Sequence, residues 1–396
     1  MKRVNGILAI ILLMIVGCGG SKQSDDFITV DVTKSYPKKE LILQDFMDVE
    51  YIPLETRNDF LCQGIVMAIG KDVILVKNQI NDGDIFVFDR DGKGLRKFNR
   101  KGRGPEEYSN IQWITLDEDN DEIFVIDAGR TIVYDLYGKY KRSFQSKDGY
   151  SYRHMYNFDK KNLICNNSTF DLPIEIDNEL APFVIISKED GIIKKYIQIP
   201  YEQRKSTMMI QLNSGAILNS ANMGAKNIKP EEISSMSIFS YFPVIPYDDS
   251  WIIAGPSFDT IFRFLPDYGM KPFMVRTPSI QSMNTEVFLF PTIHTERYYF
   301  MESRPMSTAP RLHLMYDRHE KIIYECTVFN DDFSTKSIVN MFNATINTEI
   351  AFQQKLEADD LFDAYKEGKL KGKLKEIAAG LKEEDNPVIM LVKHKK

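Results

Sequence analysis

The 396-residue chain is poor in the residue types and patterns that most often mark active sites. Its five histidines form no HxH or HExxH pattern, so their spacing indicates no metal site. No GxSxG sequence is present, which removes the local signature of a serine hydrolase. None of the four cysteines belongs to a CxxC pair or to a zinc-ligand spacing. The sequence therefore predicts no catalytic residues, no cofactor and no metal ion.

The chain also lacks an excess of positive charge and a long hydrophobic run. Its formal net charge is −6, whereas a nucleic-acid-binding face requires a basic surface. The apolar run at residues 6–17 is shorter than the roughly 20 residues of a bilayer-spanning helix. We therefore expect no nucleic-acid partner and no transmembrane helix at the N-terminus.

The N-terminus is typical of a secretion signal. Lys2 and Arg3 precede the apolar run, so residues 1–17 are predicted to be a signal peptide. The residues Ile15-Val16-Gly17-Cys18 resemble the bacterial lipobox. This resemblance implies a lipid on Cys18, which would anchor the protein in a Gram-negative envelope, at the outer membrane on its periplasmic or surface side. An ordinary signal peptide with a chance cysteine is the alternative.

Three cysteines remain if Cys18 carries a lipid, namely Cys62, Cys165 and Cys326. An odd number cannot all pair within one chain. We expect them to be buried as small hydrophobic side chains, the usual state of free cysteine.

A short sequence occurs twice. Residues 87–98 are VFDRDGKGLRKF and residues 133–144 are VYDLYGKYKRSF, so Val, Asp, Gly, Lys, Arg and Phe recur 46 positions apart. Each copy is predicted to be a strand, a tight turn at Gly92 or Gly138, and a second strand. A repeat of this length, built from short strands, is typical of the four-stranded blades of a β-propeller.

The predicted fold is therefore all-β, a six-bladed β-propeller of four-stranded antiparallel blades at residues 41–396. Residues 18–40 are predicted to be a tether with one early strand at 27–32. Residues near 200–236 do not fit the repeat and are predicted to be an insertion with a short helix starting near Pro230. The strands of the first five blades are predicted at 64–70, 73–77, 85–89 and 94–99; 111–116, 122–127, 131–135 and 140–145; 153–158, 163–166, 182–187 and 192–199; 238–246, 251–254, 260–264 and 272–276; and 287–293, 297–302, 311–317 and 321–328.

The C-terminal part changes its period. A helical insertion is predicted near 346–381 from apolar residues at helical spacing: Phe352, Leu356, Leu370, Leu374, Ile377 and Leu381. Residues 388–392 return to a strand pattern. We predict that they join the strand at 49–55 in the sixth blade, with 340–345 as its inner part. This pairing would close the ring and remove an open sheet edge.

Three stretches resemble the six-bladed β-propeller lipoproteins of Bacteroides-type bacteria, whose propellers are NHL-like. They are Tyr51-Ile52-Pro53-Leu54-Glu55-Thr56, residues 98–108 with the sequence FNRKGRGPEEY, and Asn386-Pro387-Val388-Ile389. The stretches occur in order over essentially the whole mature chain, and GRGPEEY is the most specific. The resemblance implies a propeller fold and an envelope location, and it implies no catalytic residues.

Propeller geometry indicates where a ligand could bind. The loops between blades and the loops between the second and third strands of each blade share one face. Convergent arginines on this face could hold a carboxylate, phosphate or sulfate. Alternatively, Arg103 binds carbonyl groups of its own loop and no anion site exists. The candidate ligand-binding residues are Arg103, Asp127, Arg130, Asp259, Arg304 and Arg311.

Three functional hypotheses follow. The first is a binding or interaction module on the envelope, for a protein or glycan partner, and the lack of a catalytic motif favours it. The second is an enzyme of the lyase or lactonase type at the axial mouth, and the scarcity of histidine counts against it. His294 and His313 could meet near the axis, and a purely structural role for these histidines is the alternative. The third is a scaffold without a small ligand. The side chains that line the axial mouth distinguish these hypotheses.

Overall fold

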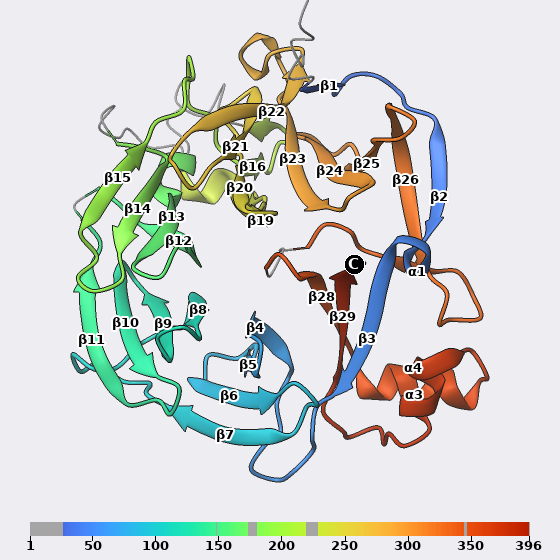
Figure 1. Cartoon of the computed structure of the whole chain (residues 1–396). Coiled ribbons are helices and arrows are strands. Elements are labelled where there is room, and N and C mark those ends of the chain that lie inside the picture. The colour runs from blue at the N-terminus through green and yellow to red at the C-terminus, as the bar shows by residue number, and fades with distance from the viewer. Residues whose placement is uncertain (1–26, 148, 173–179, 219–228, 344–346, 396) are drawn as a thin grey trace, which may run out of the picture.

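The computed structural model describes residues 27–147, 149–172, 180–218, 229–343 and 347–395. Its sheets stand around a central axis, with the first strand of each sheet innermost (Figure 1). The first three sheets each have four antiparallel strands in sequence order, and the predicted all-β propeller is confirmed. Their strands are β4 (Ile65–Ile69), β5 (Val73–Lys77), β6 (Asp84–Asp89) and β7 (Gly94–Asn99); β8 (Trp113–Asp117), β9 (Glu122–Asp127), β10 (Arg130–Asp135) and β11 (Tyr140–Gln145); and β12 (Tyr152–Asn157), β13 (Asn162–Asn167), β14 (Phe183–Ser187) and β15 (Ile193–Ile197).

The fourth and fifth sheets each gain an outer strand from the N-terminal segment. This segment passes along the outside of the ring before it enters the sixth sheet (Figure 1). β1 (Ile28–Asp31) pairs in parallel with β22, and β2 (Lys38–Ile42) pairs in parallel with β26. Part of the range predicted as a tether therefore covers two sheet edges. The other strands of these sheets are β19 (Val244–Tyr247), β20 (Ser250–Ile253), β21 (Thr260–Phe264) and β22 (Met270–Thr277); and β23 (Val287–His294), β24 (Tyr298–Pro305), β25 (Leu312–Asp317), β26 (Ile322–Asn330) and β27 (Ser337–Val339).

The sixth sheet joins the two ends of the described chain. β29 (Val388–His394) lies antiparallel between β28 (Ile350–Leu356) and β3 (Met47–Pro53), so the predicted closure by terminal strands is confirmed. Its inner strand is β28. Residues 340–343 of the predicted inner part are not in a strand, and residues 344–345 lie outside the described ranges. The apolar pair used to predict a helix here, Phe352 and Leu356, is four residues apart. That spacing places two side chains on one face of a strand as well as of a helix, so the pair could not distinguish them.

Helices cover the outside of this last sheet. α3 (Ala358–Lys366) and α4 (Gly372–Ala378) bury Leu361 and Leu374 in the same apolar cluster as Phe352, together with Leu370 from the connection between the helices. The predicted helical insertion is therefore present, although its helices begin after β28. Another short helix, α1 (Leu43–Phe46), connects β2 to β3. No helix within the described ranges is long and apolar enough to cross a membrane.

The segment before the fourth sheet forms a small sheet of its own. Its strands are β17 (Ile217–Leu218), β16 (Met208–Leu212) and β18 (Ile233–Ile238). The predicted strand at 238–246 is thus divided, because β18 pairs with β16 and β19 begins only at Val244. The predicted helix near Pro230 is a three-residue 3-10 turn, η2 (Pro230–Glu232).

The repeated sequence links neighbouring sheets. Arg96 donates through Nε to the Leu136 carbonyl at 2.7 Å, and Arg142, its counterpart in the second copy, donates to the Lys188 carbonyl at 3.1 Å. Gly138 has a φ of +79°, and a Cβ built on it would lie 2.4 Å from the ring of Phe98. The repeated arginine, phenylalanine and glycine therefore recur because each sheet must fit the next.

Candidate functional site

A cavity of about 670 Å³ lies at one axial end of the propeller. Its walls come from the C-terminal ends of the inner strands β4 and β12, from the whole length of β8, from β19 and β20, and from residues 347–349. This is the end at which the first and second strands of each sheet are joined, and we call it the cavity end. The volume falls within the roughly 300–1,000 Å³ typical of small-molecule sites.

Aromatic side chains form much of the wall. The chain has two tryptophans, and both Trp113 and Trp251 line this cavity. Tyr156 lies between them, with ring centroids 5.7 Å from Trp113 and 6.4 Å from Trp251. Phe158 stacks on Trp251 at 6.3 Å. Trp113 and Trp251 are both half-buried residues, and each contributes surface to the cavity.

Hydrogen bonds between strands and within one turn hold this wall in place. Trp113 Nε1 donates to the Met155 carbonyl at 3.0 Å, and Thr115 Oγ1 donates to the same carbonyl at 2.6 Å, which ties β8 to β12. The carboxylate of Asp159 accepts the backbone N–H groups of Lys161 and Asn162 at 2.7 and 2.8 Å. The position of the aromatic wall is therefore fixed from both sides.

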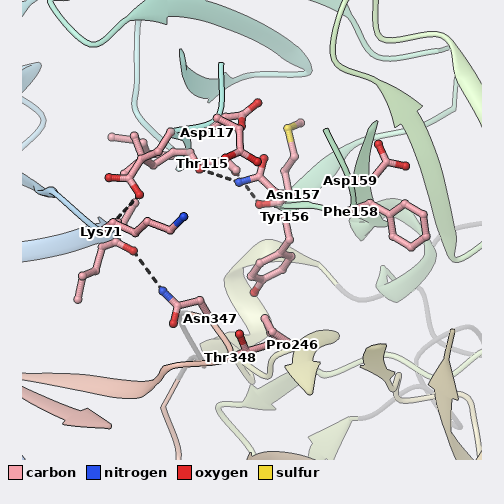
Figure 2. Close-up of a pocket in the computed structure, with 18 of the residues that line it drawn as sticks. Lys71, Thr115, Asp117, Tyr156, Asn157, Phe158, Asp159, Pro246, Asn347 and Thr348 are labelled. Atoms are coloured by element: carbon pink, nitrogen blue, oxygen red, sulfur yellow. Dashed lines mark hydrogen bonds between the residues drawn. The ribbon is translucent and has the colours of Figure 1, made fainter. Parts of the chain in front are cut away.

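Two polar atoms in the wall, one of them buried, have no hydrogen-bond partner among the described residues. Asn157 Nδ2 donates to the Leu116 carbonyl at 2.7 Å, but Asn157 Oδ1 is buried without a hydrogen-bond partner in the described structure. Tyr156 is 8% exposed, and no described residue bonds its hydroxyl group, which points toward the open space of the cavity (Figure 2). Burial raises the pKa of Tyr156, so this hydroxyl is neutral. An unpaired buried polar group costs about 1–3 kcal/mol, which a ligand can recover.

The rim of the cavity is charged and mostly acidic. Five carboxylate residues line it against three lysines. Lys188 is already paired, with its Nζ 2.6 Å from Asp117 Oδ2, and both side chains are buried. Glu118 accepts the backbone N–H groups of Lys71 and Asp72. The Lys71 ammonium group instead extends toward the cavity, without an ion pair to any residue of the described ranges (Figure 2).

The residues predicted to bind a ligand lie at the opposite end of the strands, here called the loop end. Asp117 and Glu122 pair at the cavity end, and Asp127 lies five residues further along β9, ~17 Å away at about 3.3 Å per residue. The sequence therefore predicts ligand binding at the loop end, whereas the cavity of about 670 Å³ lies at the cavity end.

The structure brings Asp127 and Arg130 together and leaves Arg103 apart from them. Arg130 donates to the carbonyls of Pro105 and Glu107 and lies 3.5 Å from Asp127, which also accepts two bonds from Ser109. Arg103 is exposed and has no hydrogen bond or ion pair with a described residue. The GRGPEEY loop is thus held by arginine–carbonyl bonds, but from Arg130 rather than from Arg103.

The remaining predicted residues are also engaged by the protein. Asp259 accepts from Arg276 Nη1 at 3.1 Å, Ser279 Oγ at 2.5 Å and Ile280 N at 2.7 Å. Arg304 and Arg311 share the fully buried Glu302, each at 3.4 Å. Burial raises the pKa of Glu302, and the two guanidinium groups oppose that rise.

The two histidines considered near the axis have separate environments. His294 pairs across the strands with Tyr299 and packs against the rings of Tyr247 and Phe273. His313 pairs with Glu302 instead. Burial lowers the pKa of His294 to about 3, so its ring is neutral. Within the described ranges, no group of three or more His, Cys, Asp or Glu side chains is placed to hold a metal ion.

Sequence similarity identifies the family. A family model described as "Domain of unknown function (DUF4934)" matches residues 27–393. The chain belongs to the DUF4934 family. A search of curated proteins found no match to this DUF4934 chain.

Solved structures resemble this DUF4934 chain in fold. A Bacteroides fragilis protein described as exported aligns with a TM-score of 0.58 and 16% identity, covering 94% of this chain and 100% of that one. A DUF4221 family member from Bacteroides vulgatus aligns with a TM-score of 0.43 and 10% identity, covering 89% and 98%. Virginiamycin B lyase from Staphylococcus aureus aligns with a TM-score of 0.34 and 11% identity, covering 72% and 94%. Only the first score exceeds 0.5, and at 16% identity it shows the fold alone.

Proposed function

We propose that this protein is a binding module of the bacterial cell envelope that holds a small ligand, or one end of a larger one, in the axial cavity. The observation that carries the proposal is the composition of the wall. Both tryptophans of the chain lie beside Tyr156, whose hydroxyl group no described residue bonds, and the same wall contains the unpaired Asn157 Oδ1. A concave apolar site with a few convergent polar groups is the usual form of a ligand site.

Tryptophan fluorescence tests this role directly, because every tryptophan of the chain lines the cavity. We expect at least one compound from a library of small neutral, charged and apolar probes to shift the emission and raise the melting temperature. Trp251→Ala should weaken that binding, whereas Arg103→Ala at the loop end should leave it unchanged. Binding that is insensitive to Trp251→Ala would contradict the proposal. Recovery of a chemically changed probe would indicate an enzyme instead.

We also propose that a lipid on Cys18 anchors the chain to the envelope, as in the six-bladed NHL-like lipoproteins that its sequence resembles. Support comes from the signal-like residues 1–17 and from the exported character described for the Bacteroides fragilis relative in fold. Cys18→Ala should move the protein from the membrane fraction to the soluble fraction and remove the mass of the lipid. Unchanged membrane association with an unchanged mass would contradict the anchor.

A further inference from the structure

We propose that the ligand of the axial cavity is a neutral, hydroxyl-rich molecule, that is, a saccharide without charged groups. This inference rests on the proposed binding role of the cavity. Three features of the wall carry it: its aromatic surfaces, its unpaired polar atoms and its charge.

The aromatic surfaces suit the face of a sugar ring. Trp113 and Trp251 are half-buried and present apolar area on two sides of Tyr156. The face of an aromatic ring is the negative part of its quadrupole. The C–H groups on one face of a pyranose are weakly positive and apolar, so they pack on such a surface while the hydroxyl groups point outward.

The unpaired atoms require hydroxyl groups or their equivalent. Asn157 Oδ1 can only accept, so it needs a donor from the ligand, and a carboxylate or a hydrocarbon offers none. The Tyr156 hydroxyl can donate or accept. Sugar hydroxyl groups both donate and accept, so one saccharide offers a suitable partner for each of these atoms. An apolar ligand would leave both atoms unpaired.

The charges around the cavity are mixed, so an ionic ligand of either sign meets at least one group of its own sign. An anion would enter a rim with five carboxylates and three lysines, one of which is already paired with Asp117. A cation would meet the ammonium group of Lys71, which extends into the same space (Figure 2). A neutral ligand avoids both repulsions, and Lys71 can donate hydrogen bonds to its oxygen atoms.

An array of neutral and acidic oligosaccharides, followed by fluorescence titration, tests the inference. Choline and 1-naphthol serve as the cationic and apolar probes. We expect a neutral oligosaccharide to bind, and Tyr156→Phe to weaken it about fivefold to tenfold through loss of one hydrogen bond. The matched control is Tyr152→Phe, which removes a buried hydroxyl that is also unpaired in the described structure but lies outside the cavity.

The outcomes separate the inference from the proposed function. If only choline, 1-naphthol or acidic sugars bind, and Trp251→Ala weakens them, the saccharide is wrong and the binding role stands. If none of these probes binds, both are wrong. Equal losses in Tyr156→Phe and Tyr152→Phe would show that the Tyr156 hydroxyl does not touch the sugar and would overturn the assignment.

Discussion

The two axial ends of the propeller use their polar side chains differently. At the loop end, Asp127, Arg130 and Asp259 bind the backbone of nearby loops or each other. At the cavity end, the Tyr156 hydroxyl and Asn157 Oδ1 remain unpaired among the described residues. The loop end has more charged side chains, but apart from the exposed Arg103 the predicted residues there form hydrogen bonds or ion pairs within the protein. The better candidate site is therefore distinguished by polar groups that lack hydrogen-bond partners in the protein, and not by its number of charges.

The largest effect is expected at the loop end from Asp259→Ala. Arg276 is 3% exposed, and the substitution would leave its buried guanidinium group without its carboxylate. Loss of one partner of a buried pair costs roughly 3–5 kcal/mol, so we expect about 3 kcal/mol in urea unfolding. Asp249→Ala is the matched control, because the Asp249 side chain is 80% exposed beside Arg263 and should change stability by less than about 1 kcal/mol. Equal losses would contradict the assignment.

Arg130→Ala should cost about 2 kcal/mol of unfolding free energy. It removes the donors to two carbonyl groups of the GRGPEEY loop and the partner of the buried Asp127. Arg103→Ala, in the same loop but exposed, should cost less than about 0.5 kcal/mol. Chemical denaturation of both variants checks this. A larger loss for Arg103→Ala would mean that Arg103, and not Arg130, holds the loop.

Asp171 should make stability at the loop end depend on pH. Burial raises the pKa of Asp171 to about 7, against the lowering effect of the Tyr241 hydroxyl, which donates to it at 2.6 Å. The folded chain holds this proton more tightly than the unfolded chain, so the associated stability is present near pH 4 and is lost as pH rises through 7. Between pH 4 and 8, the free energy of unfolding of the wild type, measured in urea, should fall by on the order of 2 kcal/mol relative to that of Asp171→Asn. A difference that does not vary with pH would refute this.

The smallest effects on stability are expected from replacing a tyrosine by phenylalanine, which can be compared at the two ends of the propeller. The Tyr108 hydroxyl donates to the Gly83 carbonyl at 2.6 Å and accepts from Arg100 N, so Tyr108→Phe should cost about 1–2 kcal/mol. Tyr156→Phe removes no bond to a described residue and should leave the melting temperature almost unchanged. Thermal unfolding of the two variants measures the contrast. Similar losses would show that the Tyr156 hydroxyl has a structural partner.

Much of the fold is predictable because its signals are local. Alternating apolar residues and the repeated turn glycines place the strands of the first three sheets within a few residues. The parallel edges made by β1 and β2 leave no such signal, because their partners β22 and β26 lie far along the chain. The pair Phe352 and Leu356 fits a strand face and a helix face equally.

The candidate site was less predictable than the fold for a similar reason. Whether a polar side chain is free depends on tertiary partners, such as the carbonyls that Arg130 reaches more than 20 residues back. Trp113 and Trp251 come from different sheets and meet only when the ring is assembled. Their scarcity was the one available signal, but Trp113 begins β8 and Trp251 lies near the start of β20, so their positions in the sequence do not indicate a shared site.

The N-terminal segment also constrains the order in which the protein can be assembled. During synthesis β1, β2 and β3 emerge first, yet Ile28 pairs with Met274, Leu41 with Val328 and Ile52 with Ile389. The first three sheets contain only consecutive strands and can form while translation continues. The last sheet cannot form until its central strand β29 has been synthesised. Until then the nascent chain exposes unpaired strands, which are prone to aggregate. Chaperone protection should therefore matter most just before synthesis ends.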